Sequence, residues 1–430
     1  MSLSSLAALL MLCVASGPQT EAPPATSGPI AWPAGPLEVR VASPEPVDES
    51  SRSAIEGRLI SYRSGDREAA AAGDDPLGRV RIAGVSLADE GRTLILLTDP
   101  HPAEAVYRAE LPGGLGSISY DLTGVEALWT KTGGDGNEAE WAGWLPGLDL
   151  PASRDRLRAS VEHQEAFDRM GQEGSLTLRT LLAVPEGGST VRIQAERPFE
   201  AELMYVPLDV DANHLAEGVV EPFGEPVELY LVVPTGPEWD GRLPELTVSI
   251  QGEGDDGPRP IGQSDQILPW APAPIEAPAE LPELPGELAG GDATRGETVF
   301  FGEQGKCADC HRIGDRGGQV GPDLSDIGTR HSTAELYREI EAPSAVIAPE
   351  YLPYTVAMRD GRVLVGVVRA EGVGRILVVG ADAEEAALDR AEIEEIRPVS
   401  TSIMPVGLAG ALGQQDLRDL LAYLAGRRGD

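Results

Sequence analysis

The pattern of apolar and polar positions divides the chain into a strand-rich part and a helical part. Between about residue 55 and residue 252, short apolar runs, many alternating with polar residues, are separated by Gly- and Pro-containing turn signals. A polar stretch near 152–170 interrupts them and predicts helix. Many short strands at modest spacing are typical of an antiparallel β-sandwich, so we predict one sandwich domain over residues 51–252. The predicted strands are Arg58–Tyr62, Thr93–Thr98, Ala105–Glu110, Ser117–Leu122, Leu176–Leu182, Val191–Ala195, Val227–Val233 and Leu246–Ile250.

Helical signals dominate the last third of the chain. Asp292 can N-cap a helix that runs to Phe301, and Ser332 with Glu335 forms a capping box. A final amphipathic helix has leucines at i, i+3, i+4 and i+7, namely Leu417, Leu420, Leu421 and Leu424. Strand patterns lie between these helices, at 354–358, 362–369, 375–380 and 393–397. We therefore predict an all-α domain over 288–430 with a small β-barrel inserted at 351–398.

Proline-rich and apolar segments predict the remaining boundaries. Six prolines between Pro269 and Pro285 indicate an extended linker, which we place at 253–287. Eight prolines in residues 18–50 indicate a disordered leader. The apolar run Leu6–Ala15 is too short to span a bilayer but suits a signal peptide, predicted over residues 1–17. Because no other stretch is long and apolar enough to span, we expect an exported protein in the periplasm or another extracytoplasmic space.

Charge limits the possible partners. The chain has a formal net charge of −36, which argues against nucleic-acid binding because that function needs a basic surface. Residues 288–430 carry only −8 of this charge. The acidity therefore lies mainly in the N-terminal part, and it favours a basic protein partner over an acidic one.

The three cysteines include one pair with a recognisable spacing. Cys307-Ala308-Asp309-Cys310-His311 is a C-x-x-C-H sequence, typical of covalent c-type haem attachment. Each thiol can add to one haem vinyl group, and the adjacent histidine then reaches the iron. A thioredoxin-like motif would need a surrounding βαβ pattern, and a zinc site would need a second ligand pair. Neither alternative is supported, because no further cysteine is available and the remaining histidines stand singly at 101, 163, 214 and 331.

Three residues of the C-terminal part are candidates for the sixth iron ligand. Met404 lies in a turn-forming Ser-Ile-Met-Pro loop just before the last helix. Met358 lies in a predicted strand, where a core position is expected, and His331 stands alone at a helix start. A His–Met pair would make an electron-transfer site with a raised potential. We therefore favour Met404.

These motifs resemble a known domain. The chain over 292–425 resembles the haem-binding domain of planctomycete and verrucomicrobial c-type cytochromes, a class I cytochrome c-like fold. The resemblance implies one covalent haem c on Cys307 and Cys310, with His311 and Met404 as the iron ligands. By similarity to cytochromes c generally, it also implies that the Pro322 carbonyl orients the His311 ring. The motifs that carry the resemblance are GETVFF (296–301), CADCH (307–311), GGQVGPDL (317–324), EAPS (341–344), DGRVLVG (360–366), SIMP (402–405) and DLLAYL (419–424).

The strand-rich part gives weaker functional signals. Residues 120–129, 141–150 and 175–180 resemble a region that precedes such haem domains in larger fusions and has no assigned function. Trp129, Trp141 and Trp144 could form a sugar-stacking platform, although tryptophans in a sandwich more often lie in the core. His101 and His163 have acidic neighbours but belong to no catalytic motif.

Three functions are compatible with these patterns. The first is an exported monohaem cytochrome c that passes single electrons to a redox protein, with the β domain for docking or scaffolding. The second is a haem enzyme, either peroxidase-like or the cytochrome module of a dehydrogenase system. The third is a polysaccharide-binding protein with a secondary cytochrome domain.

Overall fold

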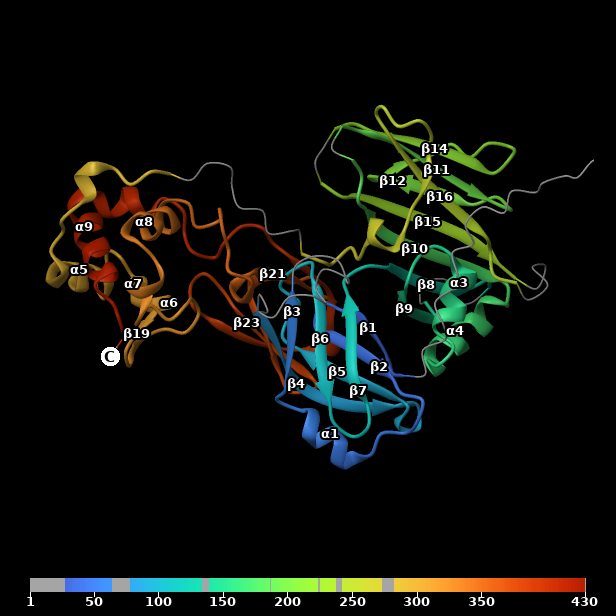
Figure 1. Ribbon diagram of the computed structural model, residues 1–430, viewed down its shortest axis with the longest axis horizontal. Coiled ribbons are helices and arrows are strands. Elements are labelled where there is room, and N and C mark those ends of the chain that lie inside the picture. The colour runs from blue at the N-terminus through green and yellow to red at the C-terminus, as the bar shows by residue number, and fades with distance from the viewer. Residues whose placement is uncertain are drawn as a thin grey trace, which may run out of the picture.

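The computed structural model describes residues 28–63, 78–133, 139–185, 187–222, 225–236, 242–272 and 282–429. The predicted signal peptide at 1–17, and with it Cys13, lies outside these ranges. None of the helices within them is both long enough and apolar enough to cross a bilayer. Figure 1 shows two β-rich units at one end of the molecule and the C-terminal helices at the other, with a further sheet between them.

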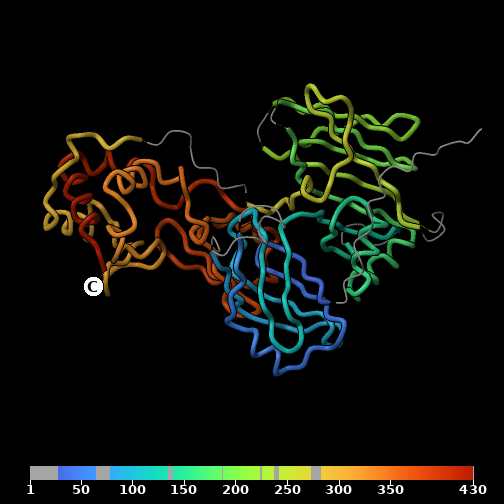
Figure 2. The backbone as a smooth tube through the Cα atoms, viewed as in Figure 1, coloured from blue at the N-terminus to red at the C-terminus, as the bar shows by residue number. Residues whose placement is uncertain are grey.

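The first β unit is a seven-stranded antiparallel sheet in the order β1-β2-β5-β4-β3-β6-β7. Its end strands β1 and β7 approach each other, so the sheet curls into a barrel-like shape (Figure 2). Trp32, Val39 and Val41 point into its core, where they are almost fully buried. We call this unit the barrel-like sheet. Its elements are β1 (Ile30–Gly35), β2 (Glu38–Ala42), α1 (Glu49–Ile55), β3 (Leu59–Arg63), β4 (Gly78–Ala88), η1 (Asp89–Gly91), β5 (Thr93–Thr98), β6 (Val106–Leu111) and β7 (Gly116–Asp121).

The second β unit consists of two antiparallel sheets and two short helices. One sheet has the order β13-β12-β15-β10-β8-β9, with β18 paired to β10, and the other has the order β14-β11-β16-β17. Its apolar core is continuous with that of the barrel-like sheet. Its elements are β8 (Val125–Lys131), β9 (Trp141–Leu145), α3 (Leu150–Arg156), α4 (Val161–Met170), β10 (Gly174–Leu182), β11 (Ser189–Ala195), β12 (Glu200–Leu203), β13 (Val206–Pro207), β14 (Leu215–Val220), β15 (Val227–Thr235), β16 (Leu246–Gly252), β17 (Arg259–Pro260), η3 (Gln263–Asp265) and β18 (Gln266–Ile267).

The structure confirms the predicted strands but corrects three boundaries. The single sandwich over 51–252 is wrong, because the strands form two units. The disordered leader over 18–50 is wrong for residues 30–50, which form β1, β2 and the start of α1. The linker over 253–287 is wrong for residues 259–271, which include β17 and β18 and bury Leu268 and Trp270. Proline content alone does not indicate disorder in the predicted leader. Pro33 lies at an irregularity of the edge strand β1, a position where sheets tolerate proline.

The C-terminal helices enclose a separate apolar core, which we call the C-terminal core. Its buried members include Phe300, Leu336, Leu420 and Leu421. Asp292 N-caps α5 by accepting from the backbone N–H groups of Thr294 and Arg295, as predicted. The Ser332–Glu335 capping box is present at the start of α8. The elements are η4 (Gly286–Leu288), α5 (Ala293–Phe300), α6 (Cys307–Cys310), β19 (Arg312–Ile313), β20 (Arg316–Gly317), α7 (Ile327–Arg330), α8 (Thr333–Glu341), η5 (Pro349–Tyr351) and α9 (Leu408–Ala425).

The predicted inserted barrel is an open sheet. Five antiparallel strands run in the order β24-β23-β22-β21-β25, with β24 and β25 at its edges. We call it the inserted sheet; it interrupts the predicted all-α domain. Its apolar face does not close on itself, because Leu37, Ala83 and Leu97 of the barrel-like sheet complete its core. The strands are β21 (Pro353–Met358), β22 (Val363–Glu371), β23 (Arg375–Val379), β24 (Glu385–Asp389) and β25 (Ile393–Pro398).

Helices α5 and α9 cross at Gly296, where their backbones nearly touch. A Cβ at Gly296 would lie 2.0 Å from the Asp419 carbonyl oxygen and 2.7 Å from the Tyr423 Cβ. The buried Asp419 carboxylate holds the same crossing, because it accepts from the Asp292 N–H at 2.7 Å and from Arg295 Nε at 2.7 Å. Only a residue without a side chain allows this approach.

We therefore expect Gly296→Ala to destabilise the C-terminal domain by about 3 kcal/mol, at the upper end of overpacking costs. The measurement is chemical denaturation followed by far-ultraviolet circular dichroism. Gly410→Ala in α9 is the matched control, since its Cβ would meet nothing within 4 Å. Equal stability of the two variants would contradict the prediction.

Candidate haem-attachment site

The C-x-x-C segment forms a single helical turn, α6. Lys306 precedes it in the left-handed conformation, with φ of 48°, and His311 follows its end. The two thiols are not joined by a disulfide. Burial raises the pKa of Cys307 to about 11 and also raises the pKa of Cys310, so both are protonated thiols at neutral pH. Two reduced thiols on one turn match the requirement for addition to two vinyl groups.

The His311 ring is held by the loop that follows the motif. Its Nδ1–H donates to the Pro322 carbonyl oxygen at 3.0 Å, the contact that the resemblance implied. A carbonyl can only accept, so the proton lies on Nδ1 and the lone pair lies on Nε2. Burial lowers the pKa of His311 and keeps the ring neutral. A neutral imidazole with a fixed tautomer is the form that binds a metal.

Glycines in this loop allow it to fold back closely on α6 and His311. A Cβ at Gly321 would lie 2.6 Å from the His311 Cε1, and one at Gly318 would lie 2.1 Å from the Asp309 carbonyl oxygen. Backbone bonds fix the same approach, with Gly321 N–H donating to the Cys310 carbonyl at 2.9 Å. The role of Gly321 was missed in the sequence. Its only signal there was its place in the GGQVGPDL motif.

The end of this loop is fixed by a carboxylate. Asp323 accepts from the Ser325 hydroxyl and backbone N–H and forms an ion pair with Arg312. Hydrogen bonds from Ser325, followed by those from Arg312, lower the pKa of Asp323 to about 2. The carboxylate therefore stays ionised at neutral pH and keeps the loop closed.

Of the three candidates for the sixth ligand, Met404 is the one that packs on the C-terminal core together with Cys307 and Ala308. The Ser402 hydroxyl accepts from the Met404 N–H at 3.1 Å, and Ser402 N–H donates to Ser344 Oγ at 3.1 Å. Met358 is buried in the core of the inserted sheet. His331 Nε2 lies 3.1 Å from Glu339 Oε1. The structure therefore places the predicted Met loop on the same core as the cysteine motif.

The residues around the motif fit a haem. Its macrocycle needs an apolar surface, two thiols and a neutral imidazole, and all three are present. Half-buried apolar side chains pack on the same C-terminal core as Cys307; they include Val299, Phe301, Leu324, Tyr337, Met404 and Leu408.

The family described as Cytochrome c matches residues 293–360, which contain the cysteine motif and the His311–Pro322 contact. This part of the chain is a cytochrome c domain. Such a domain implies haem-based electron transfer and points to covalently bound haem c. The match begins at α5 and reaches the end of β21, so it includes the first strand of the inserted sheet.

Outside the cytochrome c domain, the comparisons with known proteins give no functional assignment. No curated protein matches the chain. Among solved structures, the PA14 sugar-binding domain of an RTX adhesin shares 14% identity, covering 34% of this chain and 99% of that one, with a TM-score of 0.24. An anti-sigma factor domain-containing protein from Clostridium clariflavum shares 10%, covering 56% and 92%, with a TM-score of 0.24. An alpha-L-rhamnosidase from Dictyoglumus thermophilum shares 9%, covering 55% and 27%, with a TM-score of 0.17. Scores this low do not support a shared fold.

Of the three tryptophans considered for a sugar-stacking platform, Trp129 and Trp144 lie in the core, the position expected more often for tryptophans in a sandwich, and Trp141 is half-buried. Trp129 and Trp144 are buried, and their indole N–H groups donate within the protein, to Thr235 Oγ1 and to the Thr123 carbonyl, each at 2.9 Å. His101 and His163 are also buried. These residues stabilise the β units and do not form a surface site.

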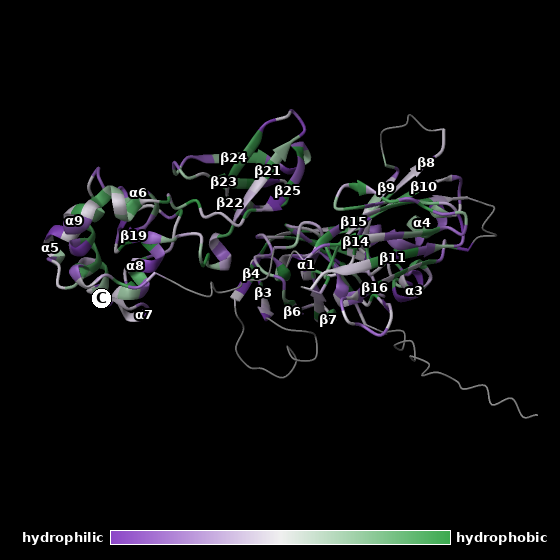
Figure 3. Cartoon of the chain, turned by 90° about the horizontal axis from the view of Figure 1, so that it is seen from above, coloured by the Kyte–Doolittle hydropathy of each residue, from purple (hydrophilic) through white to green (hydrophobic). Residues whose placement is uncertain are grey.

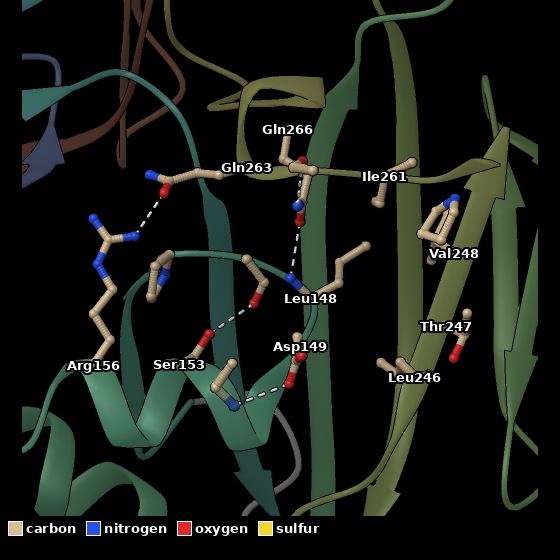
Figure 4. Close-up of a pocket in the computed structure, with 15 residues that line it drawn as sticks. Leu148, Asp149, Ser153, Arg156, Leu246, Thr247, Val248, Ile261, Gln263 and Gln266 are labelled. Carbon is tan, nitrogen blue, oxygen red and sulfur yellow. Dashed lines mark hydrogen bonds between the residues drawn. The ribbon is translucent and has the colours of Figure 1, made fainter. Parts of the chain in front are cut away.

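The second β unit contains a pocket of about 330 Å³ between α3, β16 and the loop before β18 (Figure 4). Several of its polar side chains have protein partners: Gln266 accepts from Leu148 N–H at 2.9 Å, and Arg156 donates to Gln263 Oε1 at 2.6 Å. The pocket is far from the cytochrome c domain in the fold (Figure 1). We assign no ligand to it.

Proposed function

We propose that the protein is an exported, monohaem c-type cytochrome that accepts and passes single electrons. The observation that carries this proposal is the neutral His311, oriented by Pro322, beside two free thiols on one helical turn. In the proposal, Cys307 and Cys310 attach the haem, and His311 and Met404 ligate its iron. The bound haem supplies a one-electron redox centre.

The protein's own residues then set the properties of that centre. Pro322 accepts the Nδ1 proton of His311, which strengthens the ring as a ligand through Nε2. The C-terminal core excludes water from one side of the site. Ser402 and Ser344 hold the Met404 loop against the same core. Because a thioether ligand favours ferrous iron, a His–Met pair supports a raised reduction potential.

The β units are proposed to serve docking or scaffolding, outside the cytoplasm. Residues 1–287 carry −28 of the net charge of −36. This distribution favours a basic redox protein as the partner, and it acts over a Debye length of roughly 8–10 Å. Carbohydrate binding and enzymatic activity are not part of the proposal.

Optical spectra of the periplasmically expressed protein test the proposal. We expect covalent haem, and in the oxidised form a methionine–iron charge-transfer band. Met404→Leu should abolish that band and lower the reduction potential, because leucine has no sulfur donor. Met358→Leu is the matched control, since Met358 lies in the core of the inserted sheet, and it should keep the band. Retention of the band in Met404→Leu would refute the assignment of Met404.

A further inference from the structure

Strand β22 of the inserted sheet touches both the barrel-like sheet and the cytochrome c domain. In the view from above, the inserted sheet lies between the haem-domain helices and the β units (Figure 3). Two adjacent residues of β22 make these contacts, Ala370 through its backbone and Arg369 through its side chain. Ala370 contacts the barrel-like sheet and Arg369 contacts the cytochrome c domain.

On the barrel side, the backbone of Ala370 is held at both polar atoms. Its carbonyl accepts from the Arg81 guanidinium at 2.9 Å, and its N–H donates to Asp99 Oδ1 at 3.0 Å. Arg81 and Asp99 also bind each other, with nitrogen–oxygen distances of 3.0 and 3.2 Å. The position of β22 is therefore set by a pair of side chains from β4 and the end of β5.

The turn that follows β22 fits against the same sheet. At Gly84, a Cβ would lie 2.9 Å from Val373 Cγ2 and 3.2 Å from the Gly372 carbonyl carbon. Gly84 lies at a register shift in the pairing of β4 with β5. The irregular strand leaves space for the turn, and Leu37, Ala83 and Leu97 bury the adjoining apolar face.

On the haem side, Arg369 binds the loop that orients the proximal histidine. Its guanidinium donates to the Gln319 carbonyl oxygen at 2.7 Å. Gln319 is three residues before Pro322, whose carbonyl holds His311 Nδ1 at 3.0 Å. Between them, Gly321 N–H donates to the Cys310 carbonyl at 2.9 Å. A continuous series of short contacts thus runs from Asp99 through β22 to His311.

We propose that Arg369 is a positioning residue for His311, and that β22 couples the barrel-like sheet to the reduction potential of the haem site. The redox part of this inference rests on the proposed function. The restraint of the 317–322 loop by Arg369 does not depend on the proposed function. A partner that shifts β22 by binding the barrel-like sheet would then change how firmly His311 is held.

The test uses the full-length, haem-loaded chain with Arg369→Gln. Hydrogen–deuterium exchange over residues 317–323 reports the loop, and redox titration reports the potential. Loss of one net hydrogen bond should speed exchange of the loop by about fivefold. A loosened Pro322–His311 contact makes His311 a weaker donor, so the potential should rise while haem content stays unchanged. Arg369→Lys, which keeps a donor, should recover part of both effects.

Two further variants make the test specific. Arg362→Gln is the matched control. Arg362 is an exposed arginine of the same hairpin, and its guanidinium pairs with Asp360 at 2.7 Å. This variant should leave the hydrogen exchange of the loop and the reduction potential unchanged. Asp99→Ala, in the barrel-like sheet, should change both in the same direction as Arg369→Gln.

The possible outcomes are distinguishable. Unchanged loop exchange in Arg369→Gln overturns the inference. Faster exchange with an unchanged potential overturns the positioning role of Arg369. A response to Arg369→Gln without any response to Asp99→Ala overturns the coupling to the barrel-like sheet. Absence of haem in the wild-type chain refutes the proposed function, while loop exchange still decides whether Arg369 restrains the loop.

Discussion

Replacing Gly321 with Ala is expected to reduce the haem bound per chain by about tenfold, the lower end of the effect seen when groups that orient a metal ligand are changed. The added Cβ would lie 2.6 Å from His311 Cε1 and 2.9 Å from Nδ1. The ring cannot move away without losing its hydrogen bond to Pro322. The loop cannot move away without breaking the bond from Gly321 N–H to the Cys310 carbonyl.

Haem per chain, measured from the absorbance of the pyridine haemochrome relative to protein, checks this prediction. Gly410→Ala is again the control, because its Cβ meets nothing within 4 Å and the residue lies in the same domain. Circular dichroism of both variants shows whether the domain is folded. If folded Gly321→Ala binds as much haem as wild type, the prediction is wrong, and the loop can move to accommodate the added Cβ.

Two buried histidines are expected to lower the stability of the β units by about 4 kcal/mol between pH 7.5 and pH 5, because both rings must stay neutral. Burial lowers the pKa of His101 to about 4 and that of His163 to about 4. His101 Nδ1–H donates to the Pro36 carbonyl at 2.9 Å, and its Nε2 accepts from the Tyr120 hydroxyl at 3.0 Å. His163 Nε2–H donates to the Trp144 carbonyl at 2.8 Å, and its Nδ1 accepts from the Ser160 hydroxyl at 2.7 Å. A second proton on either ring would place a charge in the core and remove an acceptor.

The direction follows from proton linkage. The unfolded chain has histidines with a pKa near 6.5, so between pH 6.5 and pH 4 it binds more protons than the folded chain. The free energy of unfolding therefore decreases as the pH falls through this window, by about 2 kcal/mol per histidine at pH 5. Burial raises the pKa of Glu104 and Glu126, which opposes the histidine effect.

Tryptophan fluorescence during urea unfolding measures this stability selectively, since all six tryptophans precede residue 271. His163→Gln isolates the histidine contribution. The variant should be less stable than wild type at pH 7.5, but its stability should fall by about 2 kcal/mol less on going to pH 5. The same pH dependence in wild type and variant would show that His163 does not carry the effect.

The cysteine–histidine motif of the candidate haem site could be read locally from the sequence. Two thiols three residues apart with an adjacent histidine need no tertiary contact to be recognised. The caps at Asp292 and Ser332 are also local, because each side chain bonds to a backbone N–H two or three residues further on. The strand at Thr93–Thr98 was predicted with its observed bounds. The choice of Met404 over Met358 followed from the turn-forming sequence around it.

The errors arose where the outcome depended on contacts between distant segments. Prolines between residues 18 and 50 indicated disorder. Trp32, Val39 and Val41 are nevertheless buried, because they pack against residues of strands that come later in the chain. The sequence also could not show which group accepts from the buried Trp129 indole N–H, because that group, Thr235 Oγ1, lies 106 residues further along the chain. The inserted sheet was predicted to close on itself, because its sequence does not show that Leu37, Ala83 and Leu97 cover its apolar face.

The spacing of Cys307, Cys310 and His311 along the chain was therefore enough to predict a haem-attachment motif. Only the tertiary structure decided how they are held. Gly321 acts through a close approach to His311, and Arg369 acts through a carbonyl 50 residues away in the chain. Such contacts depend on how segments pack in three dimensions. The strand pattern of residues 351–398 specifies a sheet, and packing against the barrel-like sheet makes that sheet a bridge to the haem site.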